Sequence, residues 1–312
     1  MIHMENLTKA FKSLTAVNRV TLHVNAGEVL ALLGPNGAGK TTTVRMLSSI
    51  LKPTSGGASI AGYDIVKQSQ LVRQHVGVLT EAPGLYTRMT GREYLEFFGR
   101  LRGMPVAHRR NRIRELTVHF KLADALDRRL GEYSKGMRQK ISLVRTLLHN
   151  PPVLLLDEPT SAMDPEGARI VRDTIEQMRR DEQRAIMICT HNLSEAEELA
   201  DRIAIINYGV IVKQGTLAEL REEFMGPPLM ELRFSERQES SKLAFMHDLV
   251  TVINQDAFLV CYTTGEPERL NPIILRKLSA AGIPVMTLSA HQQRLETVYL
   301  RILGEVAHGT TE

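Results

Sequence analysis

The stretch Gly34-Pro35-Asn36-Gly37-Ala38-Gly39-Lys40-Thr41-Thr42 decides how the first part of this 312-residue chain folds. It satisfies the pattern G-x-x-x-x-G-K-[ST], in which glycines let consecutive backbone N–H groups turn inward around a phosphate. Residues 28–33 before it, apolar from Val29 onward, predict a buried strand. Val44, Leu47 and Leu51 after it recur at helical spacing. The amino end of such a helix adds a partial positive charge. Strand, glycine-rich loop and helix together predict a phosphate-binding site.

Two side chains of this loop suit a nucleoside triphosphate. Lys40 is placed to neutralise the oxygens of the β- and γ-phosphates, and Thr41 is placed to ligate Mg²⁺. We therefore expect a nucleoside triphosphate with Mg²⁺ as the ligand.

Further apolar segments give the chain an alternating order of strands and helices. Residues 153–156 and 185–189 predict two more buried strands. Asp164 is expected to cap one helix, and Ser194 with Glu197 is expected to form the capping box of another. Strands that alternate with helices predict an α/β fold with a largely parallel sheet, whose ligands collect at the carboxyl ends of the strands.

A long helical insert is expected between the first two of these strands. Thr90 and Glu93 predict a capping box at its start. The basic residues 108–114 are interpreted as the solvated face of a helix, rather than as a nucleic-acid patch. Apolar residues recur at helical spacing in three places: Tyr94, Phe97 or Phe98, and Leu101; Ile113, Leu116 and Phe120; and, after Ser134, Met137, Ile141, Val144 and Leu148.

The segment Gly226-Pro227-Pro228 interrupts this pattern and predicts a boundary between two domains. Residues 1–222 form the expected first domain, with a helical subdomain at about 88–150. Residues 228–312 form a small α/β accessory domain. Its strands are expected at 229–234, 257–262 and 285–288, and its helices near 241–250 and 268–280.

Composition excludes several classes of protein. The chain is 43% hydrophobic and 24% charged, which fits neither a disordered chain nor a fibrous rod. Cys189 and Cys261 lie far apart without a CxxC motif, which excludes a disulfide scaffold and favours a reducing cytosol. The longest apolar runs, 29–33 and 153–156, are too short to span a bilayer. We therefore expect a chain that neither crosses a membrane nor is secreted, and whose membrane work needs a partner chain. The net charge of +4 does not by itself indicate nucleic acid.

Asp157 and Glu158 follow the strand at 153–156, which a parallel sheet can place beside the phosphate loop. An acidic pair after an apolar run is often only a solvated strand end. Beside a phosphate loop, Asp157 is interpreted as a Mg²⁺ ligand, and Glu158 as the group that polarises a water aimed at the γ-phosphate. This arrangement favours hydrolysis. His191 ends the next strand at the same edge and is either structural or part of the site.

The order and spacing of these segments resemble those of the ATP-binding cassette (ABC) ATPases over residues 1 to about 222. The resemblance implies a P-loop NTPase fold of the RecA-like type, with a mostly parallel sheet, N-terminal antiparallel strands and a helical insert. It implies ATP and Mg²⁺ as cofactors. It rests on the Walker A loop at 34–42, the signature segment Tyr133-Ser134-Lys135-Gly136-Met137, Walker B at 154–160, the D-loop Ser161-Ala162-Met163-Asp164 and the switch histidine His191.

The resemblance also implies roles for single residues. Phe11 would stack on adenine, although a buried core phenylalanine is the alternative. Catalysis would fall to Glu158 and His191. Metal contacts would come from Thr41, Asp157 and Glu81, although Glu81 stands where the family commonly has glutamine. The phosphates would be bound by Gly34, Pro35, Asn36, Gly37, Ala38, Gly39, Lys40, Thr41 and Thr42.

A second implication is a head-to-tail pair of cassettes that enclose two ATP molecules. Ser134 opens a helix, and the free N–H groups of its first turn attract an anion. Ser134, Lys135, Gly136 and Asp164 would complete the site of the other copy. Lys135 and Met137 depart from the usual LSGGQ signature, the first by adding a cation and the second by removing an amide donor. The partner is either an identical chain or a paralogous cassette.

The tyrosine-led signature, residues 81–86 and the tail at 295–300 are similar to stand-alone cassettes that power export through a separate polytopic permease. This similarity implies a cytoplasmic protein on the inner face of the cell membrane, with no nucleic-acid partner. The permease would contact the helix from Gly91 onward, where Tyr94, Phe97 and Phe98 are either an exposed patch or core. Two alternatives stay open: a soluble ABC ATPase that acts on ribosomes or nucleic acid, and a P-loop kinase, which the signature and Glu158 disfavour.

Overall fold

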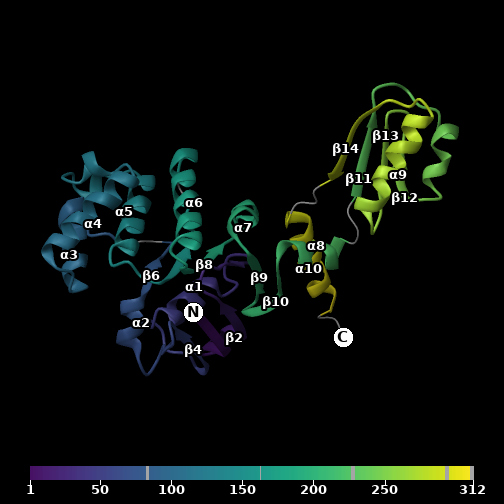
Figure 1. Ribbon diagram of the computed structural model, residues 1–312. Helices are drawn as coiled ribbons and strands as arrows, with labels where there is room; N and C mark the ends of the chain where they lie inside the picture. The colour runs from purple at the N-terminus through teal and green to yellow at the C-terminus, as the bar shows by residue number, and fades with distance from the viewer. Residues whose placement is uncertain (82–83, 162, 226–228, 292–294, 310–312) are drawn as a thin grey trace. The chain divides into compact units, whose positions relative to one another are not determined.

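The computed structural model describes residues 1–81, 84–161, 163–225, 229–291 and 295–309 (Figure 1). The chain divides into two compact units, Met1–Leu217 and Ala218–Glu312. The expected boundary segment, Gly226-Pro227-Pro228, lies outside the described residues. Within the described ranges, no helix is long and apolar enough to cross a bilayer.

A six-stranded sheet forms the centre of the first unit, in the strand order β10-β9-β3-β8-β7-β6. Its strands pair in parallel except for β9 and β10, which pair antiparallel. This confirms the predicted α/β fold with a largely parallel sheet. The strands are β3 (Val29–Leu33), β6 (Val76–Leu79), β7 (Val153–Asp157), β8 (Ala185–Thr190), β9 (Arg202–Asn207) and β10 (Val210–Gly215).

The central strands are buried on both faces, because each face carries its own hydrophobic core. Leu30, Leu155 and Met187 belong to one core, whereas their neighbours Leu154 and Ile186 belong to the other. This alternation follows from the two-residue period of a strand. It explains why these strands are apolar at nearly every position.

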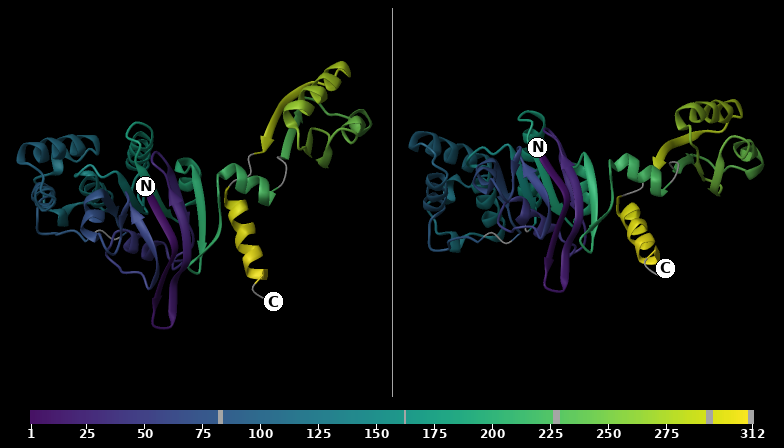
Figure 2. Two further views of the ribbon diagram at one scale, coloured as in Figure 1. Left: turned by 60° about the horizontal axis from the view of Figure 1, so that its bottom comes forward. Right: turned by 90° about the horizontal axis from the view of Figure 1, so that it is seen from below.

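A second, antiparallel sheet of the first unit has the order β2-β1-β4-β5, and β2 runs beside β10 (Figure 2). The N-terminal antiparallel strands implied by the family resemblance are thus confirmed. Both sheets share one core with helices α1 and α2. These elements are β1 (Ile2–Phe11), β2 (Leu14–Val24), β4 (Ser55–Ile60), β5 (Tyr63–Asp64), α1 (Lys40–Leu47) and α2 (Ser69–His75).

The second core of this unit joins the parallel sheet to the helical insert and to α6 (Pro165–Arg180). The predicted capping box of Thr90 and Glu93 is present at the start of α3. The insert consists of α3 (Gly91–Leu101), α4 (Val106–His119), the short 3-10 helices η1 (Ala123–Ala125) and η2 (Leu130–Glu132), and α5 (Lys135–Leu147).

Two expectations for the insert are wrong in part. Leu101 is 68% exposed, and Leu95 takes the core position instead, because α3 turns its Tyr94 and Leu95 side toward the sheet. Arg109 is buried and its Nε lies 2.5 Å from Oε2 of Glu96, so the basic run 108–114 is not wholly a solvated face. An arginine beside a carboxylate can be buried, because the ion pair compensates part of the desolvation cost.

The predicted helix caps differ from the observed ones in detail. Asp164 holds the N-cap position of α6, but its side chain makes no capping hydrogen bond. The expected Ser194–Glu197 box is wrong, because α7 (Leu193–Leu199) begins earlier and is capped by Asn192. Oδ1 of Asn192 accepts hydrogen bonds from the backbone N–H groups of Ser194 and Glu195, at 3.1 and 3.3 Å.

The second unit contains an antiparallel sheet in the order β12-β13-β11-β14, with a core that includes Leu232, Tyr262 and Ile274. The short, polar β12 was not predicted, and the helix expected near 241–250 is a 3-10 helix. The elements are α8 (Leu217–Met225), β11 (Leu229–Phe234), η3 (Ser240–Met246), β12 (Thr251–Gln255), β13 (Leu259–Thr263), α9 (Pro267–Ala280), β14 (Val285–His291) and α10 (Leu295–Gly309).

Candidate nucleotide-binding site

The loop between β3 and α1 can be built only with glycine at two positions. Gly39 is the N-cap of α1 and has φ of 110°, which L side chains rarely adopt. A Cβ atom on Gly39 would lie 2.5 Å from the carbonyl oxygen of Ala16, and one on Gly34 would lie 2.3 Å from that of Ile206. The backbone of the loop therefore packs directly against the backbone at Ala16 and Ile206, and these contacts fix the shape of the loop.

A pocket of about 360 Å³ lies at the carboxyl ends of the strands. The parallel sheet brings the loop together with Glu81, which follows β6, and with Asp157 and Glu158 at the end of β7. Of the residues that line this pocket, only Ala16 was not predicted. The predicted ones are Asn36, Gly37, Ala38, Gly39, Lys40, Thr41, Thr42, Glu81, Asp157 and Glu158.

Lys40 is held by the start of the loop. Its Nζ donates hydrogen bonds to the carbonyl oxygens of Gly34 and Pro35, at 2.6 and 3.0 Å. The residue is only 7% exposed. The loop thus presents a fixed positive charge together with the N-terminus of α1, the combination that binds phosphate.

Thr41 and Asp157 form a pair of oxygen ligands that fits a magnesium ion. Oγ1 of Thr41 donates to Oδ2 of Asp157 at 2.9 Å. Burial raises the pKa of Asp157, and the charges of Glu81 and Glu158 raise it further. A cation at this position would compensate the repulsion. Among the described residues, no three His, Cys, Asp or Glu side chains form a metal cage. Mg²⁺ takes one or two protein ligands and leaves the rest to phosphates and water, and the pair of Thr41 and Asp157 fits this number.

Glu158 is fixed by residues at the end of β8. Its Oε1 accepts hydrogen bonds from the backbone N–H and from Nδ1 of His191, at 3.0 and 2.6 Å. Its Oε2 accepts from Oγ1 of Thr190 at 3.3 Å. Its backbone has φ of 51°, and its N–H donates to the carbonyl of Cys189 at 2.8 Å. Glu158 lines the pocket, while 60% of the His191 side chain stays exposed.

Other predicted site residues lie outside this pocket. Ser134 is the N-cap of α5, where its Oγ accepts from the N–H of Met137 at 3.2 Å. Ser134, Lys135 and Asp164 are exposed, Gly136 is half-buried, and Ala162 of the D-loop lies outside the described residues. Phe11 is 45% exposed, so the alternative of a buried core residue is wrong.

Glu195 is a residue of the site region that sequence reasoning missed. It is 3% exposed, and its Oε1 accepts from Oγ1 of Thr160 at 2.7 Å. Thr190, which contacts Glu158, also hydrogen-bonds to Glu195, and burial raises the pKa of Glu195. In the sequence, Glu195 gives no such signal, because glutamates in the first turn of a helix are common and usually exposed to solvent. Only the packing of α7 under the pocket reveals the contact.

Comparisons with known proteins identify the family of this chain. The family described as "ABC transporter" matches residues 17–161. The ABC transporter ATP-binding protein NatA of Bacillus subtilis is 39% identical over 259 residues, which are 81% of this chain and 100% of NatA. The daunorubicin/doxorubicin resistance ATP-binding protein DrrA of Streptomyces peucetius is 34% identical over 309 residues, 98% of this chain and 93% of DrrA.

The fold agrees as well. A solved ATP-binding subunit of an ABC transporter superposes with a TM-score of 0.68 at 29% identity, covering 72% of this chain and 94% of its own. The phosphate loop, the acidic pair after β7 and His191 occupy the expected edge of the sheet. The chain belongs to the ATP-binding subunits of ABC transporters, and it is an ATPase.

Proposed function

We propose that this chain hydrolyses MgATP to drive export through a separate membrane permease. The observation that carries the proposal is the Glu158 carboxylate, which lines the phosphate pocket and is held by His191 and Thr190. A carboxylate fixed in this way can orient a water and accept its proton.

Each residue of the pocket then has one task. The N–H groups of the loop and the ammonium of Lys40 bind the β- and γ-phosphates. Thr41 and Asp157 would hold Mg²⁺, which when bound would neutralise phosphate charge, and Glu81, which lines the same pocket, would be a further oxygen ligand. Glu158 orients the attacking water and takes its proton. His191 donates through Nδ1 to Glu158 and holds its carboxylate in place.

We further propose that two cassettes pair head to tail around two ATP molecules. Ser134, Lys135 and Asp164 are exposed and do not line the pocket of their own chain, which supports their use by a second copy. Ser134 and Gly136 would present the amino end of α5 to the γ-phosphate of the partner, and Lys135 would add a cation. Phe11 would stack on adenine from its exposed position. The second copy is an identical chain or a paralogous cassette.

Export is supported by relatives whose printed names describe drug resistance or the transport of bacitracin. Besides DrrA, the bacitracin transport ATP-binding protein BcrA of Bacillus licheniformis aligns with 97% of this chain at 31% identity. Such names favour transport over the alternative of a ribosome- or nucleic acid-directed ATPase. A permease partner would keep the chain at the inner face of the cell membrane.

The test is Glu158→Gln in the purified chain with MgATP. We expect ATP turnover to fall by roughly 10²- to 10⁴-fold, the range for a positioned general base. ATP should still bind, and a dimer should accumulate in size-exclusion chromatography. Glu5→Gln, at an exposed glutamate of β1, is the control and should hydrolyse ATP normally. Unchanged turnover in Glu158→Gln would remove Glu158 from this role.

A further inference from the structure

Gln139 is a buried glutamine on α5 whose side chain contacts the backbone of Glu158. It is 4% exposed, although its neighbours in sequence are the charged Arg138 and Lys140. Its Nε2 donates to the carbonyl oxygen of Glu158 at 3.0 Å and lies 3.5 Å from that of Pro159. Two carbonyl oxygens need a donor, and the amide supplies one. Because an unpaired polar group is costly to bury, this contact accounts for a glutamine in the interior.

The contact with Gln139 completes the anchoring of the Glu158 backbone. Glu158 has φ of 51°, a conformation that residues other than glycine keep only where their surroundings hold it. Its N–H donates to the carbonyl oxygen of Cys189 at 2.8 Å, and its carbonyl oxygen accepts from the N–H of Ser161 at 3.2 Å as well as from Gln139. With both ends of the residue held, the bond from Cα to Cβ has one direction. The start of the carboxylate side chain is therefore fixed.

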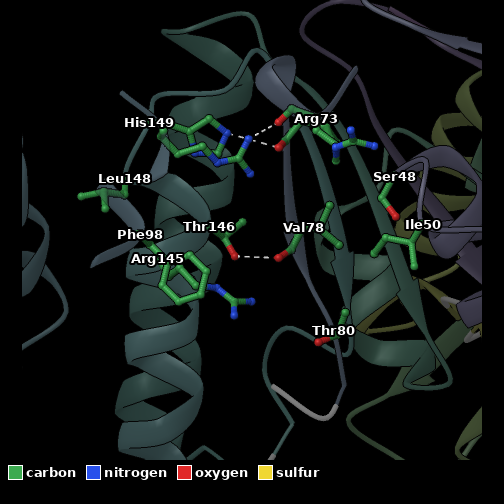
Figure 3. A pocket seen from close by; sticks show the side chains of 12 residues that line it. Ser48, Ile50, Arg73, Val78, Thr80, Phe98, Arg145, Thr146, Leu148 and His149 are labelled. Carbon is green, nitrogen blue, oxygen red and sulfur yellow. Dashed lines mark hydrogen bonds between the residues drawn. The ribbon is translucent and has the colours of Figure 1, made fainter. Parts of the chain in front are cut away.

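The α5 helix that carries Gln139 is held against the sheet at a second level. Oγ1 of Thr146, two turns further along α5, donates to the carbonyl oxygen of Val78 on β6 at 3.0 Å. Figure 3 shows this contact in the wall of a pocket of about 210 Å³, which three arginines also line: Arg73, Arg102 and Arg145. The helix is thus a fixed support from which the amide of Gln139 reaches Glu158.

The same helix begins at Ser134, its N-cap. Five residues separate Ser134 from Gln139, which is about 7.5 Å along a helix axis. Ser134 is the residue proposed above to meet the γ-phosphate of the other copy. One short stretch of helix therefore joins that residue to the backbone of Glu158 in the same chain.

We propose that Gln139 is a positioning residue for Glu158 of its own chain. Its amide holds the peptide bond between Glu158 and Pro159, so that the carboxylate keeps its place beside the attacking water. The inference rests on the proposed role of Glu158. It adds a residue of α5, the helix whose amino end is proposed to serve the other copy.

The first test is Gln139→Leu in the full chain with MgATP. We expect kcat to fall by roughly 10- to 100-fold and KM to change by less than about twofold, because the catalytic group is displaced while the phosphate loop is intact. Gln139→Glu is a second variant of similar shape, and kcat should fall in it as well, since an ionised carboxylate cannot donate to a carbonyl.

Thr146→Val is the matched control for both variants. It removes the other hydrogen bond between α5 and the sheet at constant size, and it should hydrolyse ATP like the wild type. Folding of each variant is checked by the rise in melting temperature with MgATP. A loss of kcat in Thr146→Val equal to that in Gln139→Leu would assign the effect to a loosened helix and overturn the inference.

A double variant separates positioning from a general loss of structure. Adding Gln139→Leu to Glu158→Gln should lower turnover by less than about twofold further, because no carboxylate is left to position. Independent effects would instead multiply. A full additional loss in the double variant would therefore contradict the role assigned to Gln139.

Mixed dimers show which of the two sites Gln139 serves. A Gln139→Leu chain mixed with a Lys40→Ala chain has its intact phosphate loop in the chain that lacks Gln139, and turnover should stay low. Wild type mixed with a chain that carries both substitutions has its intact loop in the other chain, and turnover should match that of wild type mixed with Lys40→Ala alone.

The inference is overturned if both Gln139 variants keep the wild-type kcat, if only KM changes, or if the defect in the mixtures follows the opposite chain. Unchanged turnover in Glu158→Gln would contradict the proposed function itself. Mixtures in which wild type gains nothing from any partner would contradict the proposed pairing, and the kcat comparison and the double variant then decide the role of Gln139.

Discussion

Among single residues, Glu195 is buried and contacts the segments that follow β7 and end β8, beside Glu158. It accepts a hydrogen bond from Thr160, which follows β7. It also forms a hydrogen bond with Thr190, and Thr190 in turn contacts Glu158. We expect Glu195→Ala to lower kcat for ATP several-fold with little change in KM, because Glu158 loses support while the phosphate loop stays intact. Glu195→Gln keeps an acceptor oxygen and should recover most of kcat. Equal losses in both variants, or a change confined to KM, would contradict a positioning role.

The same residue predicts a pH dependence of stability. Burial raises the pKa of Glu195 above its ordinary value of 4.5, so its contribution to stability is complete below that pH and is lost as the pH rises through the folded-state pKa. Glutamine does not titrate. The free energy of unfolding of Glu195→Gln, measured in urea, should therefore improve relative to the wild type as the pH rises from about 4 to 8. If the difference in free energy of unfolding between the variant and the wild type is constant over this range, the pKa of Glu195 does not change on folding.

Among the elements, α7 offers a direct comparison of two capping assignments. Asn192 caps the helix by accepting from two backbone N–H groups, whereas the sequence pattern had indicated Ser194. Asn192→Ala should lower the free energy of unfolding by about 1 kcal/mol, and Ser194→Ala should change it little. Urea unfolding of the two variants measures both values. A larger loss of unfolding free energy in Ser194→Ala than in Asn192→Ala would show that Ser194 is the N-cap.

Other elements show where pattern and structure agree. The apolar runs of β3, β7 and β8 predict these strands. Only the last residues of β7 and β8, Asp157 and Thr190, are polar, and all positions of the three strands are buried. The α3 capping box was predicted from Thr90 and Glu93 and is present. These features depend on residues within a few positions of one another. The short β12 has no such pattern, because only its pairing with β13 makes it a strand.

For the whole molecule, the proposed pairing of two cassettes has a complementation test. A chain with Ser134→Arg and a chain with Lys40→Ala each lack half of every site in a uniform dimer. Mixed in equal amounts, they should form one site with neither defect, and ATP hydrolysis should recover to about a quarter of the wild-type rate if dimers form at random and each intact site works alone. Each variant alone is the control. No recovery in the mixture would count against the trans arrangement of Ser134 and Lys40.

The sequence by itself determined the α/β class and the largely parallel character of the central sheet. It also predicted most of the phosphate pocket: residues 36–42 together with Glu81, Asp157 and Glu158. It could do so because the glycine loop needs a local backbone shape, and because parallel strands bring their carboxyl ends to one edge.

Only the tertiary structure decided which side of α3 is buried, that Glu195 contacts Thr160, and that three arginines meet in one pocket. Arg73, Arg102 and Arg145 come from three helices that are far apart in the chain. No local pattern marks such a set, because a surface arginine and a pocket arginine have the same neighbours in sequence. The three arginines come together only after the helices pack against the sheet.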